Sequence, residues 1–364
     1  MKLLLQILWG WSVLANGAVG IQVGTVQTNN QNIKLMKMNF TSPVWLQSAS
    51  NVGGGTPETR FVFVDGENQV RLSANGSVVI KSVQDGEIVL EEYSALNNTA
   101  VTINTDADTE VVIYGAVAEF STYPQYPPRN VLKSLDVSKN TALTYLFCFG
   151  STGLTSLDVS KNTALTYLNC SGTGLTSLDV SQNTALSTLL CSDLTGLTSL
   201  DVSKNTALTA LYCSGCTGLT SLDVSQNTAL TYLDCSGTGL TSLDVSRNTA
   251  LSTLLCSDLT DLTSLDVSQN TALNSLDCSG CTGMMLLNIQ NTTRLEFVEL
   301  FSSTNTNLTT LQVAGTSAMA YEKVENWLNG DAPNGGTVLV DENTPQEVID
   351  AATAKNWTVE YVDA

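Results

Sequence analysis

Apolar residues recur at fixed intervals through the middle of the chain, from about Val131 to Ala318. Cysteines that alternate with polar residues are separated by 22, 21, 22, 22, 21 and 22 residues: Cys148, Cys170, Cys191, Cys213, Cys235, Cys256 and Cys278. Aspartates keep the same steps: Asp136, Asp158, Asp179, Asp201, Asp223, Asp244 and Asp266. A period repeated about eight times predicts a solenoid in which each period is one coil.

Each period contains two similar halves, one reading LTSLDVSxNTA and the other LTYLNCSGTG or a variant. In the first half, apolar Leu157 and Val159 alternate with polar Ser156, Asp158 and Ser160. This alternation is that of a strand with its apolar side turned inward. A single strand cannot bury that side, but stacked coils make a continuous core. Because both halves are short and extended, we expect only mild curvature.

Both halves follow LxxLxΦxx(N/C/T), where Φ is Val or Cys. This pattern resembles the leucine-rich-repeat family, whose signature is LxxLxLxxN/CxL. By repeat length and by the LDVSxN wording, it is most similar to bacterial internalin-like secreted and surface proteins. The resemblance implies a mainly β leucine-rich-repeat solenoid, which we place at residues 126–317.

The repeats also form a longer unit. Residues 154–218 and 219–283 are two 65-residue blocks of three coils that differ at only eight positions. No inward Leu, Val or Cys differs between them, so the eight positions mark the outside of the solenoid.

Residues 21–125 lack the repeat and predict a small all-β domain. Alternating apolar runs are separated by the turn dipeptides Asp65-Gly66, Asn75-Gly76 and Asp85-Gly86. The runs are Arg60–Val64, Gly76–Ile80 and Thr109–Tyr114. We expect a last strand near Val111 to Phe120 to start the solenoid, and residues 123–128 to form a rigid connector.

Residues 318–364 change period and predict a small α/β cap. We expect a helix at Ala318–Leu328, a strand at Thr337–Val340, a helix ending near Lys355 and a strand at Trp357–Val362. The run Thr344-Pro345-Gln346-Glu347 has the wording of a capping box before the second helix. Caps of this kind would cover the open end of a solenoid.

Residues 1–20 predict a secretory signal peptide. One lysine precedes a mostly apolar run from Leu3 to Ala15, and small residues follow. The run is too short to cross a membrane. The alternative is a buried strand or helix of the first domain. We therefore expect a secreted, cell-surface or periplasmic bacterial protein, with no membrane insertion.

The net charge of −19 comes from 34 acidic and 15 basic residues. No segment is basic, which argues against nucleic acid and anionic membrane as partners. The chain contains no histidine, which removes histidine-based catalysis and metal binding. We expect a monomer that is not an enzyme, with no catalytic residues, metal or cofactor. An active site in the N-terminal β domain is the weakest of the readings, because that domain lacks a clustered acid pair.

Two CxxC motifs, Cys213–Cys216 and Cys278–Cys281, have spacing that suggests zinc. They lie 65 residues apart, which is three coils or about 14 Å between strands, whereas Zn–S bonds are about 2.3 Å. We therefore interpret the cysteines as core residues. A local Cys213–Cys216 disulfide stays open in a secreted protein, and the nine cysteines leave at least one thiol free.

The seven repeated aspartates listed above form one outward column, which we call the Asp face. One interpretation is a solvated, hydrogen-bonded surface with no ligand. The sharper one is a calcium ladder, in which calcium lies between carboxylates of neighbouring coils. Loops of the known calcium-binding type are missing, so the first interpretation is favoured.

The other half-coil carries an outward column that differs from coil to coil and holds most of the exposed aromatics, which we call the variable face. Aromatic side chains beside polar groups are typical of recognition surfaces. Our candidate ligand-binding residues on it are Tyr145, Phe147, Phe149, Tyr167, Asn169, Tyr212, Tyr232 and Asp234. We expect a recognition module that binds a protein or a glycan there. The alternative is a structural spacer without a specific ligand, whose outer surface varies because nothing constrains it.

Overall fold

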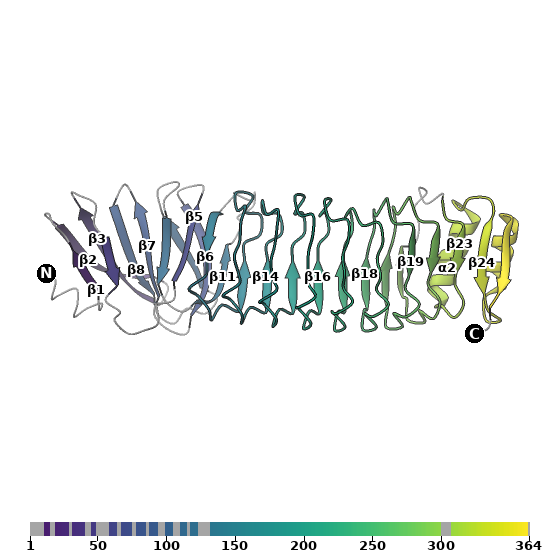
Figure 1. Ribbon diagram of the computed structural model, residues 1–364. Coiled ribbons are helices and arrows are strands. Elements are labelled where there is room, and N and C mark those ends of the chain that lie inside the picture. The colour runs from purple at the N-terminus through teal and green to yellow at the C-terminus, as the bar shows by residue number, and fades with distance from the viewer. Residues whose placement is uncertain are drawn as a thin grey trace. The chain divides into compact units, whose positions relative to one another are not determined.

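The computed structural model describes residues 132–299 and 307–362 without a break. Before them it describes the strands between residues 11 and 122 whose bounds follow (Figure 1). The chain divides into two compact units, Met1–Leu165 and Thr166–Ala364. Nearly all described elements are strands, so the predicted mainly β fold is confirmed.

Unit 1 consists of antiparallel sheet followed by the first coils. A seven-stranded sheet has the order β12-β5-β10-β7-β8-β3-β2, and β1 pairs with β4. A second sheet brings together β9, β6, β11 and β13. The strands are β1 (Trp11–Leu14), β2 (Val19–Thr28), β3 (Gln31–Phe40), β4 (Trp45–Ser48), β5 (Glu58–Phe63), β6 (Glu67–Ala74), β7 (Val78–Gln84), β8 (Glu87–Tyr93), β9 (Thr99–Asn104), β10 (Glu110–Tyr114), β11 (Val117–Thr122), β12 (Leu132–Asp136) and β13 (Tyr145–Phe147).

The three expected apolar runs correspond to β5, β7 and β10. Their turn dipeptides and the connector at 123–128 lie outside the described residues. Most of the predicted signal peptide also lies outside them, apart from β1 and the first residues of β2. The signal peptide and the domain boundaries therefore stay predictions.

The parallel ladder begins at β11. This strand pairs antiparallel with β6 on one side and parallel with β13 on the other, where Phe120 lies opposite Leu146. Both side chains are fully buried. We expected one strand near Val111 to Phe120 to start the solenoid, but the structure has two strands there, β10 and β11. The second of them, β11, begins the parallel ladder.

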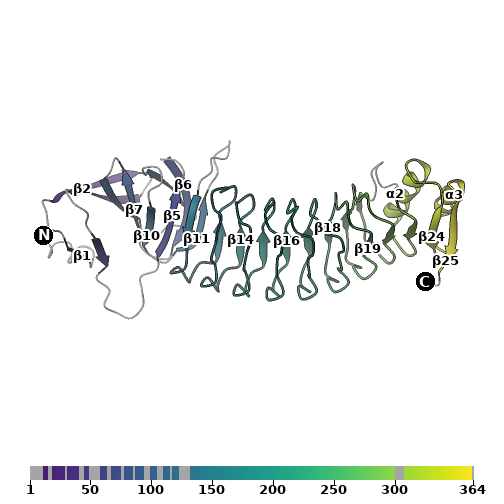
Figure 2. The same ribbon diagram turned by 45° about the horizontal axis from the view of Figure 1, so that its top comes forward.

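Unit 2 is a stack of coils with one short strand per coil on the variable half (Figures 1 and 2). These strands pair in parallel and in register, each Leu opposite the Leu of the next coil, except that Leu276 lies opposite Val298. They are β14 (Tyr167–Asn169), β15 (Thr188–Leu190), β16 (Ala210–Tyr212), β17 (Tyr232–Asp234), β18 (Thr253–Leu255), β20 (Ser275–Asp277) and β22 (Phe297–Glu299).

The Asp half differs from our expectation of a strand in every coil. In unit 2 it forms strands only from β19 (Ser264–Asp266) onward, through β21 (Leu286–Asn288) to β23 (Thr310–Gln312). Among the described residues from Leu197 to Leu262, backbone hydrogen bonds join neighbouring coils on the variable half but not on the Asp half. Backbone bonding between coils in this stretch is therefore confined to the variable half, so the two halves are not equivalent.

The core of the coils is made by the repeated apolar columns. The inward Leu, Val and Cys of each described coil are buried, except Leu157, which is half-buried. An asparagine closes each turn from inside: the Asn227 side-chain amide donates to Val202 O at 3.0 Å and Asn205 O at 2.9 Å. The inward positions expected from the repeat are confirmed, and asparagine links each coil to the one before it.

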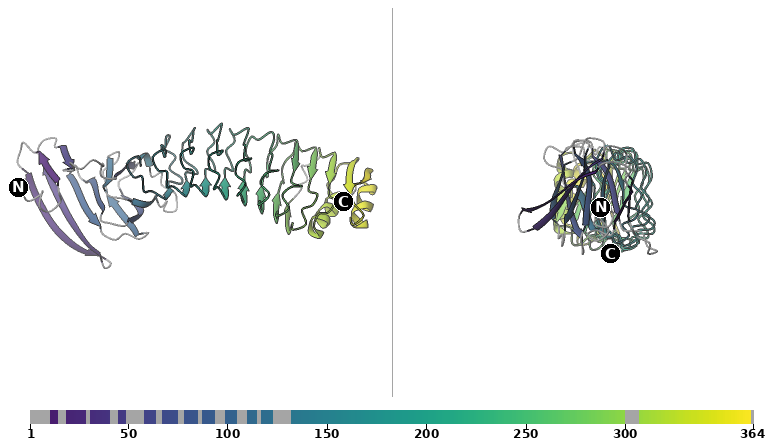
Figure 3. Two further views of the ribbon diagram at one scale, coloured as in Figure 1. Left: turned by 60° about the horizontal axis from the view of Figure 1, so that its bottom comes forward. Right: turned by 90° about the vertical axis from the view of Figure 1, so that its left-hand side faces the viewer.

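The C-terminal part of unit 2 consists of α2 (Ala318–Asn329), β24 (Gly336–Val340), α3 (Gln346–Ala354) and β25 (Trp357–Tyr361). The strands extend the sheet β19-β21-β23 in parallel, and Figure 3 shows the helices beside it. The predicted order of elements is confirmed. Neither described helix is long and apolar enough to cross a membrane.

The expected capping box is wrong. The N-cap of α3 is Pro345, which has no side-chain hydroxyl to donate or accept. The Thr344 hydroxyl instead donates to Asp341 Oδ1 at 2.9 Å and accepts from the Asp341 amide at 3.0 Å. It closes the turn after β24, so it is not available to the helix.

Candidate recognition face

The outward side chains of β14 to β20 form two parallel columns. One contains Tyr167, Thr188, Ala210, Tyr232, Thr253 and Ser275, and the other contains Asn169, Leu190, Tyr212, Asp234, Leu255 and Asp277. In each strand the central Leu is buried, while the residues on either side are half-buried, apart from buried Asn169. The variable face of unit 2 is therefore a strand surface two side chains wide.

Tyr212 and Tyr232 form the centre of this surface. Their rings are stacked across neighbouring coils, with centroids 4.6 Å apart and an interplanar angle of 28°. In the ladder, Ala210 lies opposite Tyr232, and its small side chain leaves the ring of Tyr232 beside that of Tyr212. Burial raises the pKa of Tyr232, and the nearby charge of Asp234 adds to the shift. The two stacked rings form an aromatic platform on the face.

Asp234 lies among apolar neighbours in its column, with Tyr212 on the strand before it and Leu255 on the strand after it. Its Oδ1 accepts the Ser236 amide at 3.1 Å. Its own strand places Tyr232 two residues earlier, on the same side. A carboxylate in such surroundings favours a ligand that brings a hydrogen-bond donor or a positive charge.

The predicted residues of unit 1 form a second aromatic group. The rings of Phe147 and Phe149 are 6.1 Å apart and tilted by 44°. Tyr145 and Phe147 are half-buried at the ends of β13, and Phe149 is 37% exposed. These three residues share one surface of unit 1.

Asn169 is a weaker candidate than the sequence suggests. Its side chain is only 5% exposed, and its Oδ1 accepts the Ser171 amide at 3.1 Å. Leu190 and Leu255, which flank the Tyr–Asp group, are half-buried on the same face. The repeat marks them as outward, but their chemistry makes them look like core residues.

The Asp face has one repeated hydrogen bond. In all seven coils the Asp Oδ1 accepts the amide of the serine two residues later, at 2.8 or 2.9 Å. Hydrogen bonds from this serine hold the pKa of Asp158, Asp201, Asp223 and Asp244 below the usual value: the amide is the larger cause at the first three, and the hydroxyl is the larger cause at Asp244. One oxygen of each carboxylate therefore serves the turn of its own coil.

Among the described residues, no group of three or more His, Cys, Asp or Glu side chains has an arrangement that could hold a metal ion. A calcium ion between coils would have to use the second carboxylate oxygens, together with water or backbone oxygens. The calcium ladder stays a prediction.

The nine cysteines are buried and free. Burial raises the pKa of the Cys148 thiol to about 12 and that of Cys281 to about 11. Cys216 Sγ donates to Cys191 O at 3.0 Å, and Cys281 Sγ donates to Cys256 O at 3.1 Å. The second thiol of each CxxC motif thus contacts the preceding coil, where it serves packing.

Known proteins can be compared with this repeat and its geometry. The chain matches no protein-family model and no curated protein. Among solved structures it is similar to the functional domain of InlJ from Listeria monocytogenes, which is described as including a cysteine ladder. The identity is 31%, over 57% of this chain and 62% of that one, with a TM-score of 0.29.

Two further internalins of Listeria monocytogenes also match. InlF is 16% identical over 68% of this chain and 87% of its own, with a TM-score of 0.33. Internalin C2 is 15% identical over 51% of this chain and 80% of its own, with a TM-score of 0.40. Because these TM-scores are below 0.5, the class of the protein is taken from its own sequence repeat and from the parallel pairing of strands between its coils. They make it a leucine-rich-repeat solenoid.

Proposed function

We propose that the protein is a non-catalytic recognition module, secreted by a bacterium or held at its surface or in its periplasm, that binds a protein or glycan ligand through the variable face. The observation that carries the proposal is the group of Tyr212, Tyr232 and Asp234. Stacked tyrosines beside a carboxylate and apolar Leu190 and Leu255 have the composition of an interface centre, with a large apolar area and few polar groups that fix orientation.

The backbone hydrogen bonds between coils on this half support the same surface. Between Leu197 and Leu262 only the variable half has backbone hydrogen bonds between coils, so its side chains form a continuous surface of defined geometry. The backbone that carries these side chains is held in place before a ligand binds, which lowers the entropy cost of binding.

The charge of the face narrows the ligand class. The twelve outward residues of the six variable-half strands, β14 to β18 and β20, include Asp234 and Asp277 and no lysine or arginine. A sulfated or otherwise anionic glycan would meet like charge and no cation. Neutral glycans and proteins with basic or neutral surfaces fit better.

The test is to screen the full chain against protein and neutral-glycan arrays, together with a Tyr212→Ala, Tyr232→Ala double variant. We expect the wild type to bind a ligand and the double variant to lose about tenfold or more in affinity, since truncating interface tyrosines typically costs above about 1 kcal/mol each. A Thr220→Ala, Ser242→Ala variant on the Asp face is the control, and it should bind like the wild type.

A wild type that binds nothing, or a tyrosine variant that binds equally well, would favour the spacer alternative. Replacing Tyr145 and Phe147 with alanine in a separate variant asks whether the aromatic group of unit 1 contributes as well. Circular dichroism of each variant shows whether the coils remain folded.

A further inference from the structure

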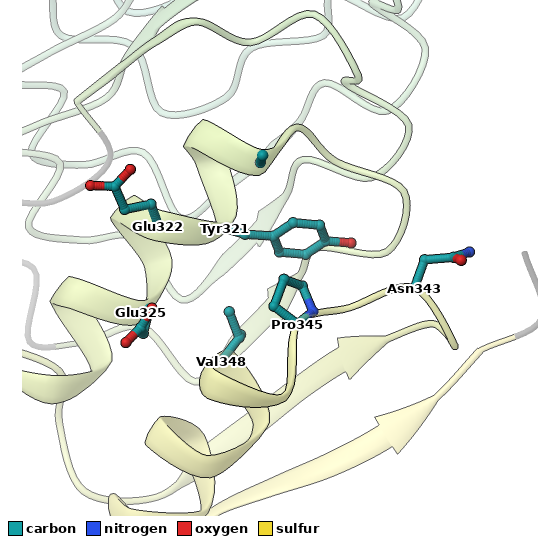
Figure 4. Close-up of a pocket in the computed structure, with 7 residues that line it drawn as sticks. Tyr321, Glu322, Glu325, Asn343, Pro345 and Val348 are labelled. Atoms are coloured by element: carbon teal, nitrogen blue, oxygen red, sulfur yellow. The ribbon is translucent and has the colours of Figure 1, made fainter.

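A recess of about 340 Å³ opens in the C-terminal part of unit 2, between α2 and the segment that leads into α3 (Figure 4). Its apolar wall consists of Ala318, Tyr321, Pro345 and Val348. Figure 4 shows the Tyr321 ring next to Pro345, with Val348 beside them. The volume is at the lower end of the range for ligand pockets, roughly 300–1,000 Å³, which suits a single side chain of a partner.

The wall is fixed by the packing of the cap. Tyr321 is only 7% exposed, and its hydroxyl lies 3.4 Å from Thr344 Oγ1. Thr344 is in turn hydrogen-bonded to Asp341. The same bonds that remove Thr344 from the end of α3 therefore hold the tyrosine in place, so the recess exists without a ligand.

The polar side of the recess is acidic. Glu322 and Glu325 come from neighbouring turns of α2 and line the recess at one side, and Asn343 lies at the other (Figure 4). No lysine or arginine is among the residues that line it. An apolar wall that ends in two carboxylates is complementary to a long side chain with a positively charged head.

The surrounding charge has the same sign. Residues 318–362 contain eight acidic and two basic side chains. Lys323 lies 3.6 Å from Glu299, and the ammonium of Lys355 donates to Gly330 O at 2.9 Å. Both cations have partners away from the recess, so the carboxylates of Glu322 and Glu325 keep a negative potential over it.

We infer that this recess binds an arginine or lysine side chain from a basic segment of a protein partner. The methylene stem lies against Tyr321, Pro345 and Val348, and the charged head pairs with Glu322 and Glu325. An anionic group would meet two carboxylates instead. The site lies on the helices of the cap, apart from the strand surface of the proposed recognition face.

The experiment measures binding of a fluorescent peptide of alternating glycine and arginine to the full chain by anisotropy, at low ionic strength. A Glu322→Gln, Glu325→Gln variant should bind about tenfold more weakly, which corresponds to about 1.4 kcal/mol. An Asp331→Asn, Glu360→Gln variant is the matched control, because it removes the same charge from exposed positions of the cap outside the recess. It should change affinity less than about twofold, as expected of a distant exposed charge.

An Ala318→Trp variant fills the recess without changing charge and should lose binding to the same extent as the glutamine variant. A peptide with citrulline in place of arginine keeps the shape and loses the charge, and should not bind. Equal weakening by both charge variants, undiminished binding to Ala318→Trp, or no binding of the arginine peptide to the wild type would overturn the inference. Tyr212→Ala should leave the peptide affinity unchanged, which separates this site from the variable face.

Discussion

Some residues belong to the turn of one coil and also form hydrogen bonds to the coil before it, and these residues join neighbouring coils. Asn227 illustrates this: it belongs to the turn of its own coil, yet its side-chain amide donates to two carbonyls of the coil before it, at 3.0 and 2.9 Å. The amide is fully inside the stack, where water cannot replace these bonds. The asparagine is therefore a polar link within an apolar core, repeated once per coil.

Replacing Asn227 with Ala should lower the free energy of unfolding by about 1–3 kcal/mol, because two buried carbonyl groups each lose one of their two donors. Asn227→Asp should cost more, since it places a carboxylate beside those carbonyl oxygens. Chemical denaturation followed by circular dichroism measures both. The adjacent exposed Thr228→Ala is the control, and a loss of the same size there would contradict this role for the asparagine.

For single residues, the sequence predicts whether a side chain points inward or outward better than it predicts which partner that side chain contacts. The period alone identifies the buried Leu, Val and Cys, because only residues that are repeated without change in both 65-residue blocks can occupy the core. It does not predict that Cys216 contacts Cys191 O, or that Thr344 bonds to Asp341, because these partners depend on the offset between coils and on local turns. The stack of Tyr212 on Tyr232 depends on the same offset.

The elements of the coil are unequal although their sequences are alike. The variable half forms a strand in each coil of unit 2, while the Asp half forms strands only from Ser264 onward. The first of these strands, β19, still has the wording LTSLDVS, but the coil it pairs with reads MMLLNIQ. Strand formation on the Asp half therefore begins where the regular repeat ends.

The Asp face should make stability depend on pH. Hydrogen bonds from the amide and hydroxyl of serine hold the pKa of Asp158, Asp201, Asp223 and Asp244 below the value of an unfolded chain. A lowered pKa in the folded state gives stability that is present above the unfolded value of about 3.9 and is lost as pH falls through the folded value. We expect the melting temperature to fall between about pH 5 and pH 3.

An Asp201→Asn variant keeps an oxygen that can accept the Ser203 amide but cannot titrate. Its melting temperature should fall less steeply over this pH range than that of the wild type. The control variant is Asp331→Asn, which removes a carboxylate from the cap instead. Equal slopes for the wild type and Asp201→Asn would show that the serine bond does not stabilise the charged form. The same melts at neutral pH, with and without millimolar calcium, test the calcium ladder, since a ligand that binds the folded state raises the melting temperature.

At the scale of the whole molecule, the repeat makes a one-dimensional stack in which each coil contacts only its neighbours. The two 65-residue blocks share every inward residue. Within unit 2 the coil that begins at Met284 packs on the coil that begins at Leu262, through bonds such as Met285 N to Thr263 O at 2.8 Å. Residues 197–215 repeat the inward residues of 262–280, so they offer the same packing surface to whatever follows.

Deleting residues 219–283 should therefore leave a folded, shorter solenoid. Gly218 occupies the same position of the repeat as Gly283, so joining Gly218 to Met284 keeps the coils in register. The variant should keep its strand signal per residue by circular dichroism and unfold cooperatively, with a smaller denaturant dependence in proportion to the surface it buries. Deleting residues 219–273 removes fewer coils but shifts the phase, so inward leucines of one coil would meet outward positions of the next. That variant should aggregate or remain unfolded. If both deletions fold equally well, stacking in register is not what stabilises the chain, and the interpretation of the repeat as a set of interchangeable coils is wrong.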